Sequence, residues 1–239
     1  MAATRPALVF AHYFGGSARS WRPLLDALGD VGDVVVPDLP GFGGTRPFAT
    51  PTLTDFADDL SARAGDRPWV AVGHSMGGKI ALAVAARKLP NLAGLILIAP
   101  SPPTPQPMSD DDRQASLDAF DNRKVAERDL TRVACRLSPA LMDTVSEDEL
   151  RVDRSTWRWW LEQGSRDDIS PRTQGLRLPT LVITGDHDNV LGAETPAQVA
   201  RNLADSSLRI VADAGHMVPL EHPRIVARLI RNFLARLAT

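Results

Sequence analysis

Short apolar runs alternate along this chain with segments of helical spacing, a pattern typical of strands and crossover helices in a parallel sheet. Because each run is continuously apolar and does not alternate with polar residues, we expect helices to cover both faces of each strand. The sequence therefore predicts an α/β fold with a mostly parallel sheet of about six strands. The runs are Ala7–Ala11, Asp33–Pro37, Trp69–Gly73, Leu92–Ala99, Thr180–Thr184 and Leu208–Ala212.

Capping residues mark the starts of amphipathic helices between these runs. Ser17 can cap a helix that carries Trp21, and either Thr52 or Thr54 starts another that carries Phe56. The closing helix follows a proline and repeats apolar residues at helical spacing, namely Ile225, Leu229, Phe233 and Leu237.

The alternation stops after the fourth run, where a proline-rich segment, 101–107, leaves the predicted sheet abruptly. From there to about Asp168 the pattern is helical and contains no strand. We therefore expect a core formed by residues 1–100 and 171–239, with helices on both faces of its sheet, and an inserted helical cap formed by residues 101–170.

The segment Gly73–Gly77 reads Gly-His-Ser-Met-Gly and fits the pattern G-x-S-x-G. It follows an apolar run and precedes an alanine-rich helical segment, 80–86. In that context the glycines let the backbone turn sharply from strand to helix, which places the serine at the carboxyl end of the sheet. We predict that Ser75 is a nucleophile.

A serine hydroxyl becomes a good nucleophile only beside a base with a pKa near 7, which a third group orients. Among the five histidines, His216 lies in a loop after the last predicted strand, at the same edge of the sheet as Ser75. His222 comes later, at the start of the closing helix, where an ordinary capping or surface residue is expected. We predict His216 as the base.

The orienting acid is expected between the nucleophile and the base along the chain. Two aspartates follow the predicted strand 180–184. Asp186 leaves the strand at once and is placed to brace the turn, whereas Asp188 reaches farther toward His216. We predict Asp188 as the acid.

Two backbone amides are expected to hold the negative charge that develops on a carbonyl oxygen during acyl transfer. One should belong to Met76, which follows the nucleophile. The other should come from the loop 12–16 after the first strand, where we choose Phe14.

In these segments the sequence resembles the α/β-hydrolase superfamily, in particular its cap-bearing serine esterases and C–C hydrolases. The resemblance implies the α/β-hydrolase fold with a helical cap, and a triad of Ser75, His216 and Asp188. Haloalkane dehalogenases and epoxide hydrolases of this superfamily use aspartate at the place of Ser75, so the serine favours acyl chemistry. The matching segments occur in family order: 12–16, Trp21, 37–43, 73–78, 185–188 and 213–216.

Aromatic residues flank the predicted site. Tyr13, the only tyrosine, stands where the family usually has glycine, and it either crowds the pocket or packs against the cap. Trp157 and Trp160 share one helical face, while Trp159 points elsewhere. This face forms either an apolar wall for the substrate or a contact between cap and core. His74, beside the nucleophile, is expected either to contact the substrate or to shape the site without taking part.

These residues favour a serine carboxylesterase that cleaves a small to medium, largely apolar ester or thioester through an acyl-enzyme. A second hypothesis uses the same triad in a C–C bond hydrolase or lyase acting on a diketone or cyclohexadiene carboxylate, which requires a basic group in the pocket. A third is a non-catalytic ligand receptor on the same scaffold. The candidate basic groups are Lys79, Arg123, Arg132 and Arg158.

Composition narrows the function classes further. The formal net charge is -2, from 27 basic and 29 acidic residues without a basic cluster, which argues against nucleic-acid binding. Without a signal-peptide pattern or an apolar stretch of membrane length, we expect a cytoplasmic monomer or homodimer with a small-molecule substrate and no membrane partner. Neither a cofactor nor a metal is expected. The single cysteine, Cys135, is expected to be buried.

Overall fold

All strands belong to one parallel sheet of six strands in the order β2-β1-β3-β4-β5-β6. The computed structural model describes residues 5–192 and 194–237. The sheet confirms the fold class expected from the alternating apolar runs. The strands are β1 (Ala7–Ala11), β2 (Val34–Val35), β3 (Trp69–His74), β4 (Leu92–Ile98), β5 (Thr180–Gly185) and β6 (Ser206–Val211).

The two edge strands differ from the sequence-based expectation. β2 is only Val34–Val35, shorter than the apolar run that predicted it, and Val34 is 42% exposed. In β6 the side chain of Ile210 is 61% exposed. The expectation that helices cover both faces of every strand is therefore wrong at the edges. At β6, α9 packs against part of the strand, and Ile210 near its carboxyl end stays exposed.

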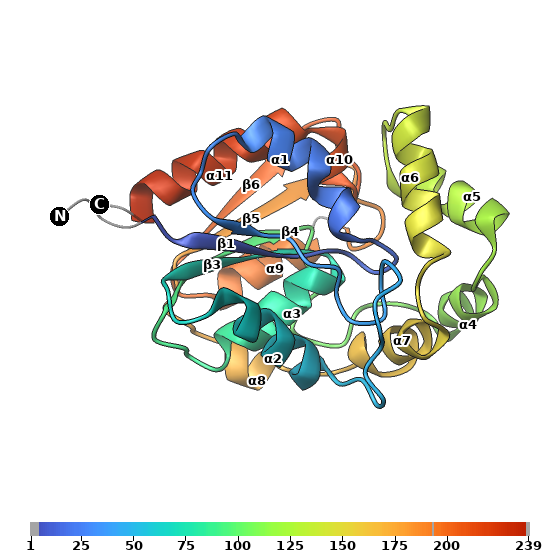
Figure 1. Cartoon of the computed structure of the whole chain (residues 1–239), viewed down its shortest axis with the longest axis horizontal. Coiled ribbons are helices and arrows are strands. Elements are labelled where there is room, and N and C mark those ends of the chain that lie inside the picture. The colour runs from blue at the N-terminus through green and yellow to red at the C-terminus, as the bar shows by residue number, and fades with distance from the viewer. Residues whose placement is uncertain (1–4, 193, 238–239) are drawn as a thin grey trace.

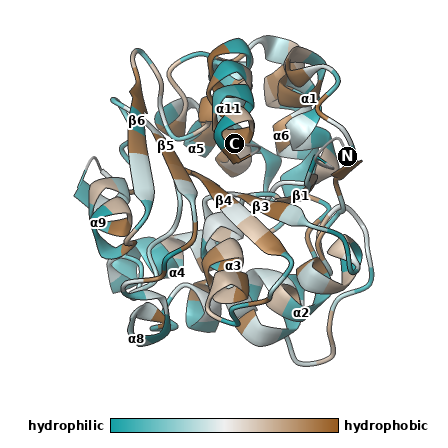
Figure 2. Cartoon of the chain, turned by 90° about the vertical axis from the view of Figure 1, so that its left-hand side faces the viewer, coloured by the Kyte–Doolittle hydropathy of each residue, from teal (hydrophilic) through white to brown (hydrophobic). Residues whose placement is uncertain are grey.

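Helices cover both faces of the sheet, as Figures 1 and 2 show. One face carries α1 (Arg22–Leu28) and α11 (Pro223–Leu237). The other carries α2 (Leu53–Ala64), α3 (Met76–Ala85) and α9 (Glu194–Asn202). The remaining short core elements are η1 (Ala18–Trp21) and α10 (Val218–Glu221).

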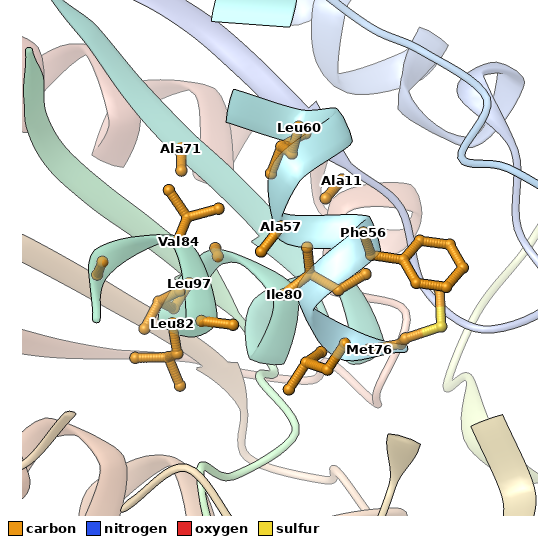
Figure 3. Close-up of a cluster of buried hydrophobic side chains, with 14 of the residues drawn as sticks. Ala11, Phe56, Ala57, Leu60, Ala71, Met76, Ile80, Leu82, Val84 and Leu97 are labelled. Carbon is orange, nitrogen blue, oxygen red and sulfur yellow. The ribbon is translucent and has the colours of Figure 1, made fainter. Parts of the chain in front are cut away.

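Alternate residues of each inner strand contribute to two separate cores. In β1, Leu8 and Phe10 pack on the side of α1 and α11, whereas Val9 packs on the side of α2 and α3. On that second side Met76 is fully buried and its side chain reaches toward the ring of Phe56 (Figure 3). Buried side chains thus fix the first turn of α3, directly after Ser75.

Side-chain caps begin the predicted helices. The side chain of Ser17 accepts from the amide of Arg19 and caps η1, which leads directly into α1. Thr52, and not Thr54, caps α2, and Asp55 completes a capping box with it. Local hydrogen bonding therefore sets these helix starts, as the sequence indicated.

Between β4 and β5 the described chain contains helices and loops but no strand. The helices α4 to α7 lie beyond the carboxyl ends of the strands (right-hand side of Figure 1), whereas α8 lies beneath the core and packs against α3. We call this segment, residues 99–179, the insertion. Within the described part of the chain, no helix is long and apolar enough to span a membrane. The helices of the insertion are α4 (Asp110–Asp118), α5 (Arg123–Val133), α6 (Pro139–Glu149), α7 (Arg154–Trp159), η2 (Trp160–Gly164) and α8 (Ser170–Thr173).

Cys135, in the insertion, is exposed, so the expectation that it is buried is wrong. It follows the end of α5 in a surface loop, where its amide donates to Glu221 Oε2 at 2.7 Å. The backbone is thus held against the core while the thiol stays at the surface.

Candidate active site

Ser75 occupies a sharp turn between the end of β3 and the start of α3. Its backbone has φ 53° and ψ -115°, a strained conformation that costs a non-glycine residue about 1–3 kcal/mol. A Cβ on Gly73 would lie 2.2 Å from the carbonyl oxygen of Gly77, and one on Gly77 would lie 2.0 Å from that of Ala11. Only glycines therefore allow this turn to pack against β1.

Loops after β5 and β6 bring a carboxylate and an imidazole to Ser75. His216 Nε2 lies 3.0 Å from Ser75 Oγ, and His216 Nδ1 lies 2.9 Å from Asp188 Oδ2. Because a carboxylate only accepts hydrogen bonds, Nδ1 carries the imidazole proton and Nε2 accepts from the serine hydroxyl. The structure thus places the three residues in one hydrogen-bonded chain.

Asp188 is a buried carboxylate with three hydrogen-bond donors. Burial raises its pKa, but the neighbouring His216 and two backbone amides outweigh burial and keep the pKa below its ordinary value. These amides belong to Val190 and Leu191, which donate to Asp188 Oδ1 at 3.0 and 3.2 Å. The carboxylate is therefore charged and fixed in orientation.

The two rejected candidates have other partners. Asp186 Oδ1 accepts from the amide of Ala214 at 3.2 Å and contacts His187 Nδ1 at 2.6 Å, so this carboxylate braces the turn. His222 Nε2 lies 2.9 Å from the carbonyl oxygen of Asp213, at the surface. Neither side chain contacts Ser75.

Two further histidines are buried and neutral. His74 Nε2 donates to the carbonyl oxygen of His216 at 2.9 Å, and burial lowers the pKa of His74 to about 3. His12 Nδ1 donates to the carbonyl oxygen of Tyr13, while its Nε2 accepts from the amide of Leu39. Burial lowers the pKa of His12 to about 4. His74 thus fixes the backbone of His216 from beside the nucleophile.

The amides of Phe14 and Met76, the two predicted oxyanion donors, are both unpaired in the described chain. Within the residues that the structure describes, neither N–H has a hydrogen-bond acceptor, although the amides of Gly78 and Lys79 donate to the carbonyl oxygen of Ser75. Unpaired amides at the start of a helix favour negative charge. The loop after β1 and the start of α3 therefore each leave one backbone donor without an acceptor from the described residues.

The sequence matches one protein family over most of its length. The model of the alpha/beta hydrolase family matches residues 8–229. This chain belongs to the alpha/beta hydrolase family. The match confirms the resemblance to the α/β-hydrolase superfamily.

This hydrolase is similar to proteins whose names refer to biotin biosynthesis or to an esterase. It is 24% identical, over 99% of its length, to the biotin biosynthesis bifunctional protein BioHC of Cellvibrio japonicus and covers 49% of that protein. Thus the chain spans about half the length of its bifunctional relatives. It is 24% identical to the pimeloyl-[acyl-carrier protein] methyl ester esterase of Yersinia pseudotuberculosis, covering 95% of this chain and 92% of that protein.

A solved esterase structure has the same fold at a somewhat higher sequence identity. The thermophilic esterase of Thermogutta terrifontis is 28% identical, with a TM-score of 0.84. The match covers 100% of this chain and 92% of the esterase chain. The core and the insertion of this hydrolase thus have a counterpart in a protein described as an esterase.

In this hydrolase Ser75 and His216 line a cavity of about 230 Å³, which the insertion also lines. Trp157 and Trp160 both face it, and the rings of Trp157 and Phe14 are 4.5 Å apart between centroids. The two tryptophans therefore combine both expected roles, because they wall the cavity and pack the insertion onto the core.

Two other aromatic residues support this wall. Trp159 does not line the cavity and instead stacks on Phe56 with 4.5 Å between ring centroids. Tyr13 lines the cavity but is only 7% exposed, and Ser20 Oγ donates to its hydroxyl at 3.3 Å. Burial raises the pKa of Tyr13, so the phenol is neutral. Tyr13 therefore narrows the cavity and also packs against the insertion, next to Leu130 and Val145.

Several polar residues of the cavity were not predicted from the sequence. Gln106 is 8% exposed and its Oε1 accepts from Ser101 Oγ at 2.8 Å. Glu149 and Asp129 also line the cavity, from α6 and α5. No local motif surrounds these residues, so only their position in the folded insertion reveals them. Among the described residues, no group of His, Cys, Asp or Glu is arranged to hold a metal ion.

The proposed basic groups lie outside the cavity. Lys79 is fully buried, and its Nζ donates to the carbonyl oxygens of Thr104, Ser165 and Asp167 at 3.1, 3.3 and 2.6 Å. Burial lowers its pKa to about 8. Lys79 therefore fastens α3 to both ends of the insertion.

The three arginines pair with acidic residues of their own helices, Arg123 with Glu127, Arg132 with Asp129 and Arg158 with Glu162. None of them lines the cavity around Ser75.

Hydrogen bonds tie the insertion to the core beside the site. The amide of His216 donates to the carbonyl oxygen of Val133, at the end of α5, at 2.7 Å. Asp148 of α6 is fully buried and accepts from Ser17 Oγ at 2.6 Å and from Arg19 Nε at 2.9 Å. The insertion is thus joined both to the loop of His216 and to the start of η1.

Proposed function

We propose that this hydrolase is a serine carboxylesterase that cleaves a small to medium, largely apolar carboxylic ester or thioester. The observation that carries the proposal is the 3.0 Å contact between Ser75 Oγ and His216 Nε2, with Asp188 Oδ2 2.9 Å from the other ring nitrogen. This arrangement supports activation of the serine at neutral pH.

The reaction would take place in two acyl-transfer steps. Ser75 Oγ attacks the acyl carbon and its proton moves to His216 Nε2, while the amides of Phe14 and Met76 hold the oxyanion. His216 then gives the proton to the departing alcohol or thiol, which leaves an acyl-enzyme. A water molecule then loses a proton to the same nitrogen and attacks the acyl carbon. The bond to Ser75 Oγ breaks as His216 returns this proton to Ser75 Oγ, which releases the acid and restores the free serine. Asp188 stabilises the imidazolium formed in each step.

The cavity supports a modest, mostly apolar substrate. Its volume of about 230 Å³ suits a short acyl or alcohol group, and most residues lining it are apolar. The esterase descriptions of the Yersinia pseudotuberculosis and Thermogutta terrifontis relatives support ester hydrolysis.

The other two hypotheses receive less support. Cleavage of a diketone or a cyclohexadiene carboxylate requires a cation to bind an acidic substrate, yet no lysine or arginine is among the residues lining the cavity. A receptor without catalysis has no need of a serine in strained geometry with a hydrogen-bonded base. Ester hydrolysis, in contrast, uses the strained serine and its hydrogen-bonded base and requires no cation in the cavity.

Labelling with a fluorophosphonate, followed by assays with p-nitrophenyl esters of acyl chains from acetate to decanoate, tests the proposal. We expect one adduct, on Ser75, and the highest kcat/KM among the short chains. In Ser75→Ala the adduct should disappear and turnover should fall on the order of 10⁴- to 10⁶-fold. Ser61→Ala is the control, because its hydroxyl only donates to the carbonyl of Ala57 in α2. An unlabelled wild type, or an active Ser75→Ala, would overturn the proposal.

A further inference from the structure

Glu149 is an acidic side chain in a cavity with otherwise few charged groups. It lies at the end of α6 and lines the cavity that contains Ser75. Within the residues that the structure describes, its carboxyl group has no hydrogen-bond or ion-pair partner. A partly buried carboxyl without a partner is costly for a folded protein, so a ligand that supplies one is favoured.

The carboxyl group lies next to the loop that would hold the oxyanion. A Cβ built on Gly15 would lie 3.5 Å from Glu149 Cγ and 3.5 Å from Glu149 Oε2. Gly15 directly follows Phe14, which lines the same cavity and whose amide has no acceptor within the described residues. A substrate with its carbonyl group in this position therefore brings a neighbouring part of the molecule within reach of Glu149.

The charged and titratable groups around Glu149 are few. Asp129 lines the cavity from α5, and it is already paired with Arg128 and Arg132 at 3.1 and 3.7 Å. Tyr13 and His216 line it from the loops after β1 and β6. No lysine or arginine is among the described residues lining the cavity, so the lining leaves room for a ligand to supply a positive or donating partner for Glu149.

We propose that Glu149 is a specificity-determining residue of this site, which binds a cationic or hydrogen-bond-donating group on the substrate and excludes esters that carry a second carboxylate. The inference rests on the proposed esterase function and adds the substrate class. It follows from the position of one unpartnered carboxyl beside Gly15, in the mostly apolar cavity that Ser75 also lines.

The ionisation of Glu149 makes this selectivity depend on pH. Burial, assisted by the charge of Asp129, raises the pKa of Glu149 to about 7. The carboxyl is therefore mostly neutral at pH 6 and mostly charged at pH 8. Preference for a cationic substrate should rise over that interval, whereas a purely structural role for Glu149 would not change it.

The test compares substrates that differ in charge but have similar shape. On the acyl side these are the p-nitrophenyl esters of 4-(trimethylammonio)butyrate, of neutral 5,5-dimethylhexanoate and of succinate. On the alcohol side they are butyrylthiocholine and its neutral 3,3-dimethylbutyl thioester counterpart. Each kcat/KM is divided by that of the neutral substrate, which cancels effects of pH and mutation common to all esters, including those on His216.

For the wild type at pH 8 we expect the cationic substrate of at least one pair to be preferred by about 10-fold or more, and succinate to be disfavoured similarly. Glu149→Gln should remove both effects and the pH dependence of the ratio. Glu147→Gln is the matched control, since Glu147 lies on the same helix, is 50% exposed and pairs with Arg19 outside the cavity. Its ratios should equal those of the wild type.

Equal charge preferences in the wild type and Glu149→Gln, with neutral esters still hydrolysed, would overturn this inference and leave the esterase proposal intact. A wild type that hydrolyses none of the esters would instead refute the esterase proposal itself. The two failures are therefore distinguishable within one set of assays.

Discussion

Replacing Asp188 by asparagine tests the proposed role of the buried carboxylate. Asp188 Oδ2 accepts from His216 Nδ1 at 2.9 Å, and its side chain is 0% exposed. In Asp188→Asn the side-chain oxygen can still accept from the amides of Val190 and Leu191, so the loop keeps its shape. The new NH₂ group then faces Nδ1 and forces this nitrogen to accept. The imidazole proton moves to Nε2, which can no longer take the proton of Ser75.

The expected loss is large because two effects combine. The variant has the wrong imidazole tautomer, and it lacks the charge that stabilises the imidazolium in a place that water does not reach. We expect kcat to fall about 10⁴-fold, the loss typical of this change in serine triads. At 1.36 kcal/mol for each tenfold change, this corresponds to about 5 kcal/mol of barrier height.

The assay is the steady-state hydrolysis of a short p-nitrophenyl ester near pH 8, with circular dichroism to show that the variant is folded. Asp186→Asn is the matched control, because Asp186 sits two residues earlier and contacts the amide of Ala214 and not His216. Its kcat should stay within about fivefold of the wild type. The reasoning fails if Asp188→Asn retains more than a tenth of wild-type kcat, or if Asp186→Asn loses as much activity.

Three further changes test the packing and the electrostatics. Gly77→Ala would place a Cβ 2.0 Å from the carbonyl oxygen of Ala11, which distorts the turn that carries Ser75. We therefore expect the variant to lose most of its labelling by fluorophosphonate, and full labelling would contradict this expectation. Trp159→Ala removes a buried ring that stacks on Phe56, and it should lower the free energy of unfolding, measured in urea, by about 3–5 kcal/mol. A loss below about 1 kcal/mol would show that this contact contributes little to stability. The pKa of Glu149 is raised from 4.5 to about 7, so the stability that its proton provides is complete below pH 4.5 and is lost as the pH rises through 7. The unfolding free energy of Glu149→Gln should therefore exceed that of the wild type by up to about 3 kcal/mol at pH 8.5, but by less than about 1 kcal/mol at pH 5. An equal difference at the two pH values would refute the raised pKa of Glu149.

Features that depend on local sequence could be predicted well. The glycines around Ser75 and the apolar run before it define the turn, because backbone sterics allow few other conformations there. The positions of His216 and Asp188 followed from strand order, since loops after parallel strands emerge at the same edge of the sheet. The cap at Thr52 is likewise a local hydrogen bond.

Features that depend on distant contacts were not predictable in the same way. An apolar run does not show whether its strand lies at an edge, and Ile210 is exposed for that reason. The role of Lys79 depends on carbonyl groups that lie far away in the chain, at the two ends of the insertion. Glu149 reaches the cavity only because α6 packs beside Gly15. Such encounters between distant segments leave no periodic signal in the sequence.

The hydrogen bond from the amide of His216 to Val133 has a mechanical consequence. If α5 swings outward to admit a substrate, it pulls on the backbone of the very residue that must accept the serine proton. The position of the insertion and the alignment of the imidazole are therefore coupled through one backbone hydrogen bond.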